Sequence, residues 1–278
     1  MGKISMIRSN PHTHSDYVDG KSPARETVER ALKLGFESLG FSEHAYQPGI
    51  DSFCGLSFEN REKYLNEIRG LQREYAGKIR IWVGLEIDRV SPETGEGLDY
   101  FIGASHYFTD EDGRYAAIDG DPDALESYVS TRFGGDWNRA IKRYFDDYAA
   151  AIERQKPTLI AHFDLIRKNN TKRHWFDEDA LLEPGKAAMR RMIACCDLME
   201  INTGGMVRSG QLSPYPTLDL LKYWRSLGGK VTVSSDCHNS LLLDGAFGEA
   251  EKLMRLAGYG EYTVLGTGES LLETRRLV

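Results

Sequence analysis

Two histidines separated by one residue lie near the start of the sequence, in the segment NPHTHSDYVDG from Asn10 to Gly20. His12 and His14 follow a short apolar run at 4–7. If this run is a β-strand, alternate side chains point the same way, so both imidazoles can bind one cation. Asp19 adds a carboxylate after a polar, turn-like step. Alone, the pair is a weak signal, because two surface or hydrogen-bonded histidines would give the same pattern.

The remaining histidines repeat this placement after other apolar runs. Six of the seven lie at or just beyond the end of a predicted strand, and only His174 does not: His12, His14, His44, His106, His162 and His238. Glu86 and Asp236 hold similar positions. Six buried imidazoles would each need a hydrogen-bond partner if they were merely structural. The set therefore predicts a metal site.

Short apolar runs alternate along the chain with amphipathic stretches of helical period. Strands are predicted at 4–7, 38–42, 79–87, 100–105, 158–161, 198–201, 230–234 and 262–265. Helices are predicted at 21–34, 58–75, 137–155, 177–195, 217–227 and 246–257. Ser22 and Ser57 are the expected N-caps of the first two helices, and Pro184-Gly185 is expected to interrupt the fourth. The acidic segment 110–135 is predicted to be a long loop with at most one short helix.

This alternation favours parallel strands joined by helical crossovers, either as a closed α/β barrel or as an open sheet. In a closed barrel the carboxyl ends of all strands meet at one rim, where active sites form. An open sheet would spread the histidines along an edge. The histidine pattern therefore favours the barrel, with the metal site at the C-terminal rim of the strands.

Composition limits the classes of partner. The 278 residues allow one large domain or two, and the net charge of -7 argues against binding to a nucleic-acid backbone. The four cysteines form no C-x-x-C pair, which favours reduced thiols. There is no apolar signal core and no run of about 18 apolar residues that would span a membrane. We expect a soluble cytoplasmic protein, and the sequence makes no prediction of oligomeric state.

At this level of detail the sequence resembles the polymerase and histidinol phosphatase (PHP) family, and within it the stand-alone histidinol-phosphatase branch. The resemblance runs over essentially the whole chain. Its motifs are HTH at 12–14, GFSEH at 40–44, GLE at 84–86, GASH at 103–106, AHFDLIR at 161–167, EINTG at 200–204 and SSDCH at 234–238. The match to the branch depends mainly on 162–167, on 202–205, and on Arg208 with Pro214-Tyr215-Pro216.

The resemblance implies a distorted (β/α)7 barrel that forms a single domain over 1–278, with the last predicted strand outside the ring. It also implies two or three divalent ions, Zn, Mn or Fe. The first ion would be bound by His12, His14, Glu86 and Asp236. The second would be bound by Glu86, His106 and His162, and the third by Asp19, His44 and His238. Some family members have a histidine in place of Asp19, which affects the third position.

The chemistry expected of such a centre is phosphate-ester hydrolysis. Metals that share a carboxylate lower the pKa of a water, and the resulting hydroxide attacks phosphorus in line with the leaving alkoxide. Candidate catalytic residues are Glu86, Asp236, His238 and Arg167. Candidate substrate-binding residues are Arg167, Arg208 and His44, with Lys168 as a further cation. We expect Glu43, Asp88, Asp164 and Glu200 to orient the ligand histidines.

Three functions fit these residues. The first is hydrolysis of L-histidinol phosphate to L-histidinol and phosphate in histidine biosynthesis, as the resemblance implies. The second is another phosphoesterase of the same barrel, acting on a nucleotide or other small phosphate ester, which would need a stacking surface. The third is a non-catalytic metal-stabilised module, which would predict lost ligand positions. The partner we expect is a small-molecule phosphate ester, without nucleic acid or membrane. One carboxylate of the acidic segment could face the substrate's amine, although a solvated loop is the simpler interpretation; the candidates are Asp110, Glu111, Asp112, Asp119, Asp121 and Asp123.

Overall fold

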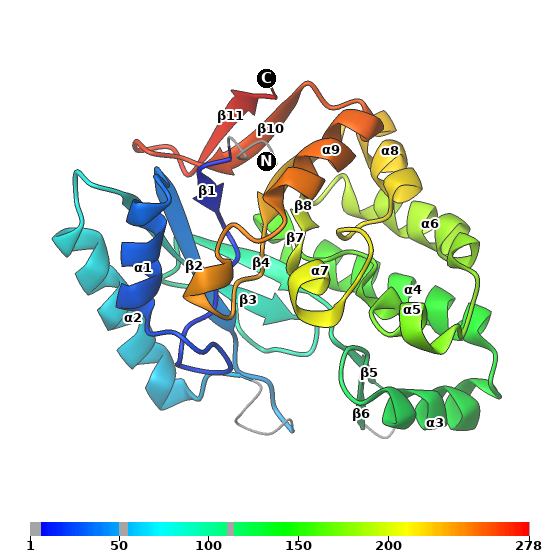
Figure 1. The fold of residues 1–278 in the computed structure, drawn as a ribbon. Coiled ribbons are helices and arrows are strands. Elements are labelled where there is room, and N and C mark those ends of the chain that lie inside the picture. The colour runs from blue at the N-terminus through cyan, green and yellow to red at the C-terminus, as the bar shows by residue number, and fades with distance from the viewer. Residues whose placement is uncertain (1–6, 50–54, 110–113, 278) are drawn as a thin grey trace.

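Seven parallel strands, each hydrogen-bonded to the next, form a nearly closed barrel in the computed structural model (Figure 1). The structure describes residues 7–49, 55–109 and 114–277. The strands are, in order around the ring, β1 (Ser9–Asn10), β2 (Ser38–His44), β3 (Arg80–Asp88), β4 (Tyr100–Ala104), β7 (Leu159–Ile160), β8 (Leu198–Asn202) and β9 (Lys230–Ser234). The predicted distorted (β/α)7 barrel is therefore confirmed.

The ring closes between β1 and β9, and we call this join the seam. The backbone nitrogen of His14 donates to the carbonyl oxygen of Cys237 at 2.8 Å. The backbone nitrogen of Cys237 donates to the carbonyl oxygen of His12 at 3.1 Å. Because β1 is only two residues long, closure depends on these bonds beyond the strand itself. The predicted strand at 4–7 lies mostly outside the described residues, and the observed strand begins at Ser9.

Helices cover the outside of the ring between the strands (Figure 1). The longer ones are α1 (Ala24–Lys33), α2 (Phe58–Glu74), α3 (Pro122–Phe133), α4 (Trp137–Gln155), α6 (Leu182–Met192), α8 (Leu218–Ser226) and α9 (Phe247–Ala257). The short helices are η2 (Leu165–Arg167), α5 (Asn170–Arg173), η3 (Glu178–Leu181), α7 (Gly204–Ser209) and η4 (Ser240–Leu242), and of these only η3 falls within a predicted helix, the one at 177–195. None of the helices in the described part of the chain is long and apolar enough to cross a bilayer.

The helix α4 shows how the periodic pattern forms the core. Its stripe of Ala140, Tyr144, Tyr148 and Ala151, which repeats at helical spacing, is buried because these side chains face the barrel wall. The hydroxyl of Tyr148 lies 2.8 Å from two carbonyl oxygens, those of Gly103 and Ala161. These contacts join the helix to β4 and to the end of β7.

The acidic segment is more structured than the sequence predicted. It contains β6 (Tyr115–Ala117), which pairs antiparallel with β5 (Tyr107–Thr109) just before the segment, and the whole of α3. The prediction of a long loop was wrong, because a few widely spaced apolar residues, Phe108, Ile118, Leu125 and Val129, are buried among acidic neighbours. Asp121 caps α3 by accepting from the backbone nitrogen of Asp123.

Two predicted helix boundaries were also wrong. The first helix begins at Ala24, and Ser22 does not cap it; Ser57 does cap α2, as predicted. The helix α6 runs through Pro184 without interruption, because the proline lies in the first turn, where its missing N–H has no intrahelical partner to lose. Gly185 packs against the side chain of Leu220, where a Cβ would approach within 2.7 Å.

The last predicted strand lies outside the ring, as expected. It is β10 (Glu261–Leu265), which pairs antiparallel with an unpredicted strand, β11 (Leu272–Arg276). The indole nitrogen of Trp82 donates to the carbonyl oxygen of Gly266 at 2.9 Å, and the hydroxyl of Ser38 donates to that of Leu265 at 2.6 Å. The hairpin therefore covers the N-terminal end of the barrel and leaves the opposite rim open. Cys195, Cys196 and Cys237 are free thiols, whereas Cys54 lies outside the described residues.

Candidate metal centre

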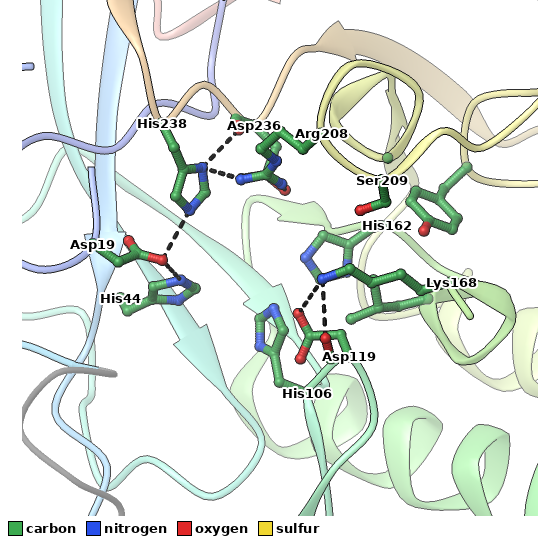
Figure 2. A pocket seen from close by; sticks show the side chains of 13 residues that line it. Asp19, His44, His106, Asp119, His162, Lys168, Arg208, Ser209, Asp236 and His238 are labelled. Atoms are coloured by element: carbon green, nitrogen blue, oxygen red, sulfur yellow. Dashed lines mark hydrogen bonds and ion pairs between the residues drawn. The ribbon is translucent and has the colours of Figure 1, made fainter. Parts of the chain in front are cut away.

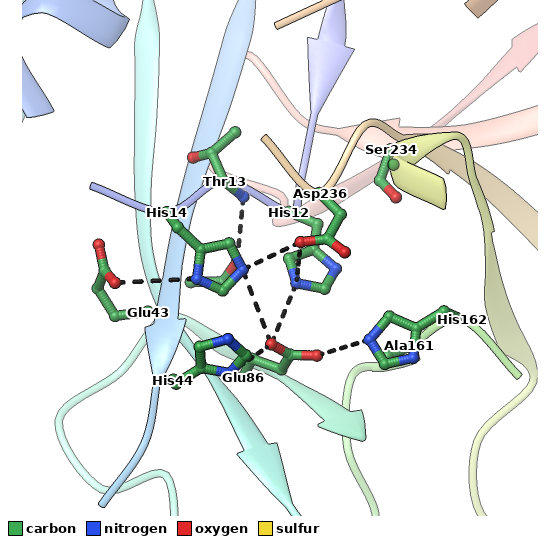
Figure 3. Close-up of polar contacts among 12 residues, drawn as sticks. His12, Thr13, His14, Glu43, His44, Glu86, Ala161, His162, Ser234 and Asp236 are labelled. Carbon is green, nitrogen blue, oxygen red and sulfur yellow. Dashed lines mark hydrogen bonds and ion pairs between the residues drawn. The ribbon is translucent and has the colours of Figure 1, made fainter. Parts of the chain in front are cut away.

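All nine side chains predicted to bind metal converge at the C-terminal rim of the barrel (Figures 2 and 3). His44 is the last residue of β2, and Glu86 lies near the end of β3. The others follow strand ends: His12, His14, Asp19, His106, His162, Asp236 and His238. This convergence follows from the parallel ring, which brings the carboxyl end of every strand to the same side.

Glu86 lies at the centre of the cluster and faces histidines with both of its oxygens (Figure 3). Oε1 lies 2.9 Å from Nε2 of His162 and 3.5 Å from Nε2 of His106. Oε2 lies 3.4 Å from Nε2 of His12 and 2.9 Å from Nδ1 of His44. A carboxylate with one oxygen toward each group of imidazoles has the geometry needed to bridge two cations.

Asp236 joins the first group from the opposite side of the seam. Its Oδ1 lies 3.2 Å from Nε2 of His14 and 3.6 Å from Nε2 of His12. Its backbone has a φ of 48°, a left-handed conformation that non-glycine residues seldom adopt. Such conformations persist where the surrounding structure enforces them, often at functional sites.

A third group lies closer to solvent. His238 Nε2 is 3.0 Å from Asp19 Oδ2, and His44 Nε2 is 3.7 Å from the same oxygen (Figure 2). The side chain of Asp19 is 40% exposed, whereas those of His12 and Glu86 are at most 1% exposed. This group is thus the most accessible part of the cluster.

The donor atoms fit a cation better than they fit each other. Among the described residues, Nε2 of His12 and both ring nitrogens of His14 are buried with no hydrogen-bond partner, and Oε2 of Glu86 makes no hydrogen bond although Nδ1 of His44 lies 2.9 Å away. A buried polar atom without a partner costs about 1–3 kcal/mol, which a bound cation would offset. Three sets of ligand atoms lie within 4.8 Å of one another: His14 with Asp19, His44 and His238; His12 with His14 and Glu86; and His44 with Glu86 and His106.

The electrostatics of the cluster favour charged side chains despite burial. Burial alone would lower the pKa of His12, but the carboxylates of Glu200, Asp236 and Glu86 raise it well above its usual value. Burial would raise the pKa of Glu86, but His12, His106 and His44 hold it well below its usual range. Glu86 is therefore ionised and ready to bind a cation at neutral pH.

Carboxylates behind the histidines set the ring orientations, as expected, for two of the four candidates, Glu200 and Asp88, whereas Glu43 lies too far from His14 for a hydrogen bond. Glu200 Oε2 lies 2.9 Å from Nδ1 of His12, and Asp88 Oδ2 lies 3.1 Å from Nδ1 of His106. Glu43 lies 3.8 Å from Nδ1 of His14. Asp164 instead accepts from Arg167 and from the backbone nitrogen of Thr217, so it contacts no ligand histidine.

A cavity of about 320 Å³ opens over the cluster (Figure 2). Its floor includes Asp19, His44, His106, His162, Asp236 and His238, and its walls are Asp119, Leu165, Lys168, Gly205, Arg208, Ser209 and Tyr215. Arg208 lies where the sequence predicted it. Its guanidinium donates to Asp236 Oδ2 at 2.5 Å and contacts Nδ1 of His238.

Arg167, predicted as both a catalytic and a substrate-binding residue, is not part of the cavity wall. Its side chain is 2% exposed, and it donates to Asp164, Gln211 and the carbonyl oxygens of Ser213 and Pro214. Its guanidinium also lies 4.6 Å from the ring centre of Tyr215. The structure therefore places Arg167 behind Tyr215, as support for the wall.

Asp119, Ser209 and Tyr215 line the cavity, although their sequence context offered little reason to place them there. Asp119 Oδ2 lies 3.0 Å from Nζ of Lys168 on the cavity wall, although a solvated loop had been the simpler interpretation. Burial would raise the pKa of Asp119, but Lys168 and His106 lower it to about 2. A usable signal was present, because Asp119 follows Ile118 at the end of a short apolar run. For Ser209 the only signal in the sequence was its position next to Arg208.

Comparison with known proteins is consistent with this geometry. The family model of the PHP domain matches residues 10–203. A histidinol-phosphatase of Lactococcus lactis subsp. lactis (strain IL1403) is 37% identical over 284 residues, covering 92% of this chain and 93% of the relative. A probable histidinol-phosphatase of Schizosaccharomyces pombe is 24% identical over 252 residues, covering 84% and 80%.

A solved structure shares the fold. The histidinol phosphate phosphatase of L. lactis, crystallised with Zn, L-histidinol and phosphate, superposes with a TM-score of 0.70 at 21% identity, covering 94% of this chain and 98% of that one. The family model covers most of the barrel and every ligand position up to His162. The chain therefore belongs to the PHP domain family.

Proposed function

We propose that this protein is a metal-dependent phosphomonoesterase that hydrolyses L-histidinol phosphate to L-histidinol and phosphate. The observation that carries the proposal is the cavity, which has histidines and carboxylates in its floor, Arg208 on one wall and Asp119 on another. Two relatives that cover most of the chain carry this activity in their names. The structure crystallised with L-histidinol and phosphate has the same fold.

The cluster would hold two or three divalent ions, Zn, Mn or Fe. His12, His14, Glu86 and Asp236 would bind the first, and Glu86 would share the second with His106 and His162. Asp19, His44 and His238 would bind the third. When bound, such ions activate a water and neutralise the charge that develops on the phosphoryl oxygens.

The protein's own cations would hold the phosphate. Arg208 presents a planar fork of donors that matches two phosphate oxygens, and Lys168 adds a point charge on the cavity wall. Asp236 holds the Arg208 guanidinium at the edge of the cluster, so the donors are already oriented before substrate enters. His238, which contacts Arg208, would bind the third ion on the same side of the cavity.

The other walls would bind the organic half of the substrate. Histidinol carries an amine, and Asp119 offers a carboxylate that stays ionised at neutral pH. Leu165 and the ring of Tyr215 supply apolar surface for the imidazole. A cavity of about 320 Å³ admits a small ester but little more.

A nucleotide or another small phosphate ester is the alternative substrate. One relative supports considering this alternative. A DNA polymerase/3'-5' exonuclease of Bacillus subtilis is 29% identical over 98 residues, covering 35% of this chain. Base recognition needs an aromatic stacking surface. All four tryptophans lie in the described part of the chain, and none lines the cavity. Trp137 and Trp175 stack on each other, with their ring centres 4.5 Å apart. Among the described lining residues only Tyr215, besides the histidines, offers a ring for stacking, and it fits an imidazole as well as a base, so phosphate release from both substrates decides between them.

A substrate panel tests the proposal. The chelated protein is reconstituted separately with Zn, Mn and Fe, and phosphate release is measured with histidinol phosphate, nucleoside monophosphates and sugar phosphates. We expect a strong preference for histidinol phosphate and loss of turnover with a chelator. Comparable rates on unrelated esters would reject the substrate assignment but leave a phosphoesterase. The cytoplasmic location and the absence of a nucleic-acid partner stay predictions of the sequence.

A further inference from the structure

The third group of ligands is built differently from the other two. Asp19 and His238 lie on loops and are 40% and 15% exposed, whereas His12, His14 and Glu86 are held at strand ends and are at most 1% exposed. Asp19 and His238 also come from opposite sides of the seam between β1 and β9. Their separation therefore depends on how firmly the two loops are held together.

Backbone bonds hold the seam near the strands and continue along the loops. His14 and Cys237 are joined by a bond of 2.8 Å at the rim. Farther out, the backbone nitrogen of Lys21 donates to the carbonyl oxygen of His238 at 2.7 Å. This bond lies two residues from Asp19 in sequence and on His238 itself, so the third group spans the outer part of the seam.

A cluster of three side chains completes the seam beyond Lys21. The backbone nitrogen of Ser240 donates to the hydroxyl of Ser22 at 3.2 Å. The hydroxyl of Ser240 donates to Oε1 of Glu26 at 2.5 Å, and the hydroxyl of Ser22 lies 3.2 Å from the same oxygen. Both serines are buried, with exposures of 5% and 1%. The sequence had suggested a helix cap for Ser22, and this cluster is its actual role.

The cluster joins three segments. Ser22 ends the loop that carries Asp19, Ser240 begins the short helix η4 that follows His238, and Glu26 lies on the first turn of α1. Figure 1 shows the short orange helix beside α1. The carboxylate is the final acceptor of the cluster, so it determines which way both hydroxyls point.

We propose that Glu26 is a positioning residue for the third cation subsite, acting through Ser22 and Ser240. This inference rests on the proposed loading of the cluster with divalent ions. Glu26 contacts no ligand. It holds together the two loops that carry Asp19 and His238, so that both can bind one ion. Outer partners of metal ligands typically change affinity by about 10- to 100-fold when they are lost.

The effect should be confined to one ion. The ligands of the first two groups are fixed by strands and by Glu200, Asp88 and the inner seam bonds, none of which involves Glu26. In Glu26→Ala the weakest Zn site should therefore lose affinity about 10-fold or more, whereas the other sites keep theirs. Glu26→Gln retains an oxygen acceptor for both hydroxyls and should bind nearly as the wild type does.

The experiment titrates Zn into chelator-treated protein by calorimetry and measures bound Zn per chain after gel filtration. Glu29→Ala is the matched control, because this exposed glutamate lies on the same helix. After gel filtration we expect three bound Zn ions per chain in wild type, Glu29→Ala and Glu26→Gln. We expect two bound Zn ions per chain in Glu26→Ala. If Glu26→Ala does not fold, Ser240→Ala tests the same bond.

Three outcomes would overturn the inference, and they can be told apart. Three ions of unchanged affinity in both Glu26→Ala and Ser240→Ala would reject the positioning role and leave the proposed function intact. A wild-type chain that binds only two ions would reject the third subsite itself, and the role of Glu26 with it. Uniform weakening of every site would show a general structural effect and also reject the proposal.

Discussion

At the scale of single residues, the guanidinium of Arg208 both faces the cavity and pairs with Asp236. Its guanidinium lies on the cavity wall and is held by Asp236, which is itself a predicted ligand. The sequence could predict its role, because Arg208 follows β8 closely and belongs to a recognisable motif. It could not separate Arg208 from Arg167, since both follow strand ends and only the packing of 211–216 decides which one faces the cavity.

Replacing Arg208 by Ala should weaken phosphate binding. We expect kcat/KM to fall roughly 10- to 100-fold, because a charge-assisted, bidentate contact is lost. Inorganic phosphate should inhibit the variant less, in the same proportion. Arg190→Ala, a change on the outer face of α6, serves as the control. An unchanged inhibition constant for phosphate in Arg208→Ala would remove this residue from the substrate site.

Asp119 gives a sharper test of substrate choice. In Asp119→Asn, kcat/KM for histidinol phosphate should fall by about 10-fold, because the charged partner of the amine is lost. A phosphomonoester without an amine, such as p-nitrophenyl phosphate, should be hydrolysed at nearly the wild-type rate. Equal losses on both substrates would instead mean that Asp119 acts by holding Lys168, which lies 3.0 Å away.

At the scale of secondary structure, the predictable parts were those whose pattern is repeated and local. Strand ends followed by histidines, and the apolar stripe of α4, needed no knowledge of distant contacts. The failures share a physical cause, which is that long-range packing overrode local composition. Ile118 and Leu125 are buried and so anchor a segment that is otherwise acidic. The hydroxyl of Ser22 hydrogen-bonds to the hydroxyl of Ser240 instead of capping a helix.

The join between α4 and the barrel can be tested at Tyr148. In Tyr148→Phe, the carbonyl oxygens of Gly103 and Ala161 lose a buried donor. The free energy of unfolding should fall by about 1–3 kcal/mol. For a chain of this size, Tm should fall by roughly 2–4 °C for each kcal/mol. Activity at 25 °C should change little, because Tyr148 does not line the cavity. An unchanged Tm would mean that water replaces the lost hydroxyl.

At the scale of the whole molecule, the site and the fold depend on each other. The barrel brings six histidines to one rim, although they are spread over most of the chain. The barrel could be predicted from the alternation of strands and helices together with that spread, and the number of strands in the ring from the family resemblance. The shortness of β1 and the resulting reliance on seam bonds could not, because they depend on how the first and last strands meet.

Removal of divalent ions should therefore lower stability as well as activity. A ligand present at 100 to 1,000 times its Kd stabilises the folded state by about 2.7–4.1 kcal/mol. Chelation should then lower Tm by roughly 5–15 °C, with recovery when Zn is added back. Chelation should lower the Tm of Glu86→Ala by less than that of the wild type, because this variant lacks the carboxylate that two ions would share. Identical melting curves with and without chelator would argue against tight ion binding to the folded chain.

The position of the seam also bears on how the protein is made. Asp236 and His238 follow β9, the last strand of the ring, while His12 and His14 follow the first. A nascent chain that has emerged from the ribosome only as far as β8 thus presents an incomplete set of ligands. With the proposed ligand sets, the first and third ions could be fully bound only after translation has passed residues 236 and 238, whereas all ligands of the second, Glu86, His106 and His162, emerge earlier.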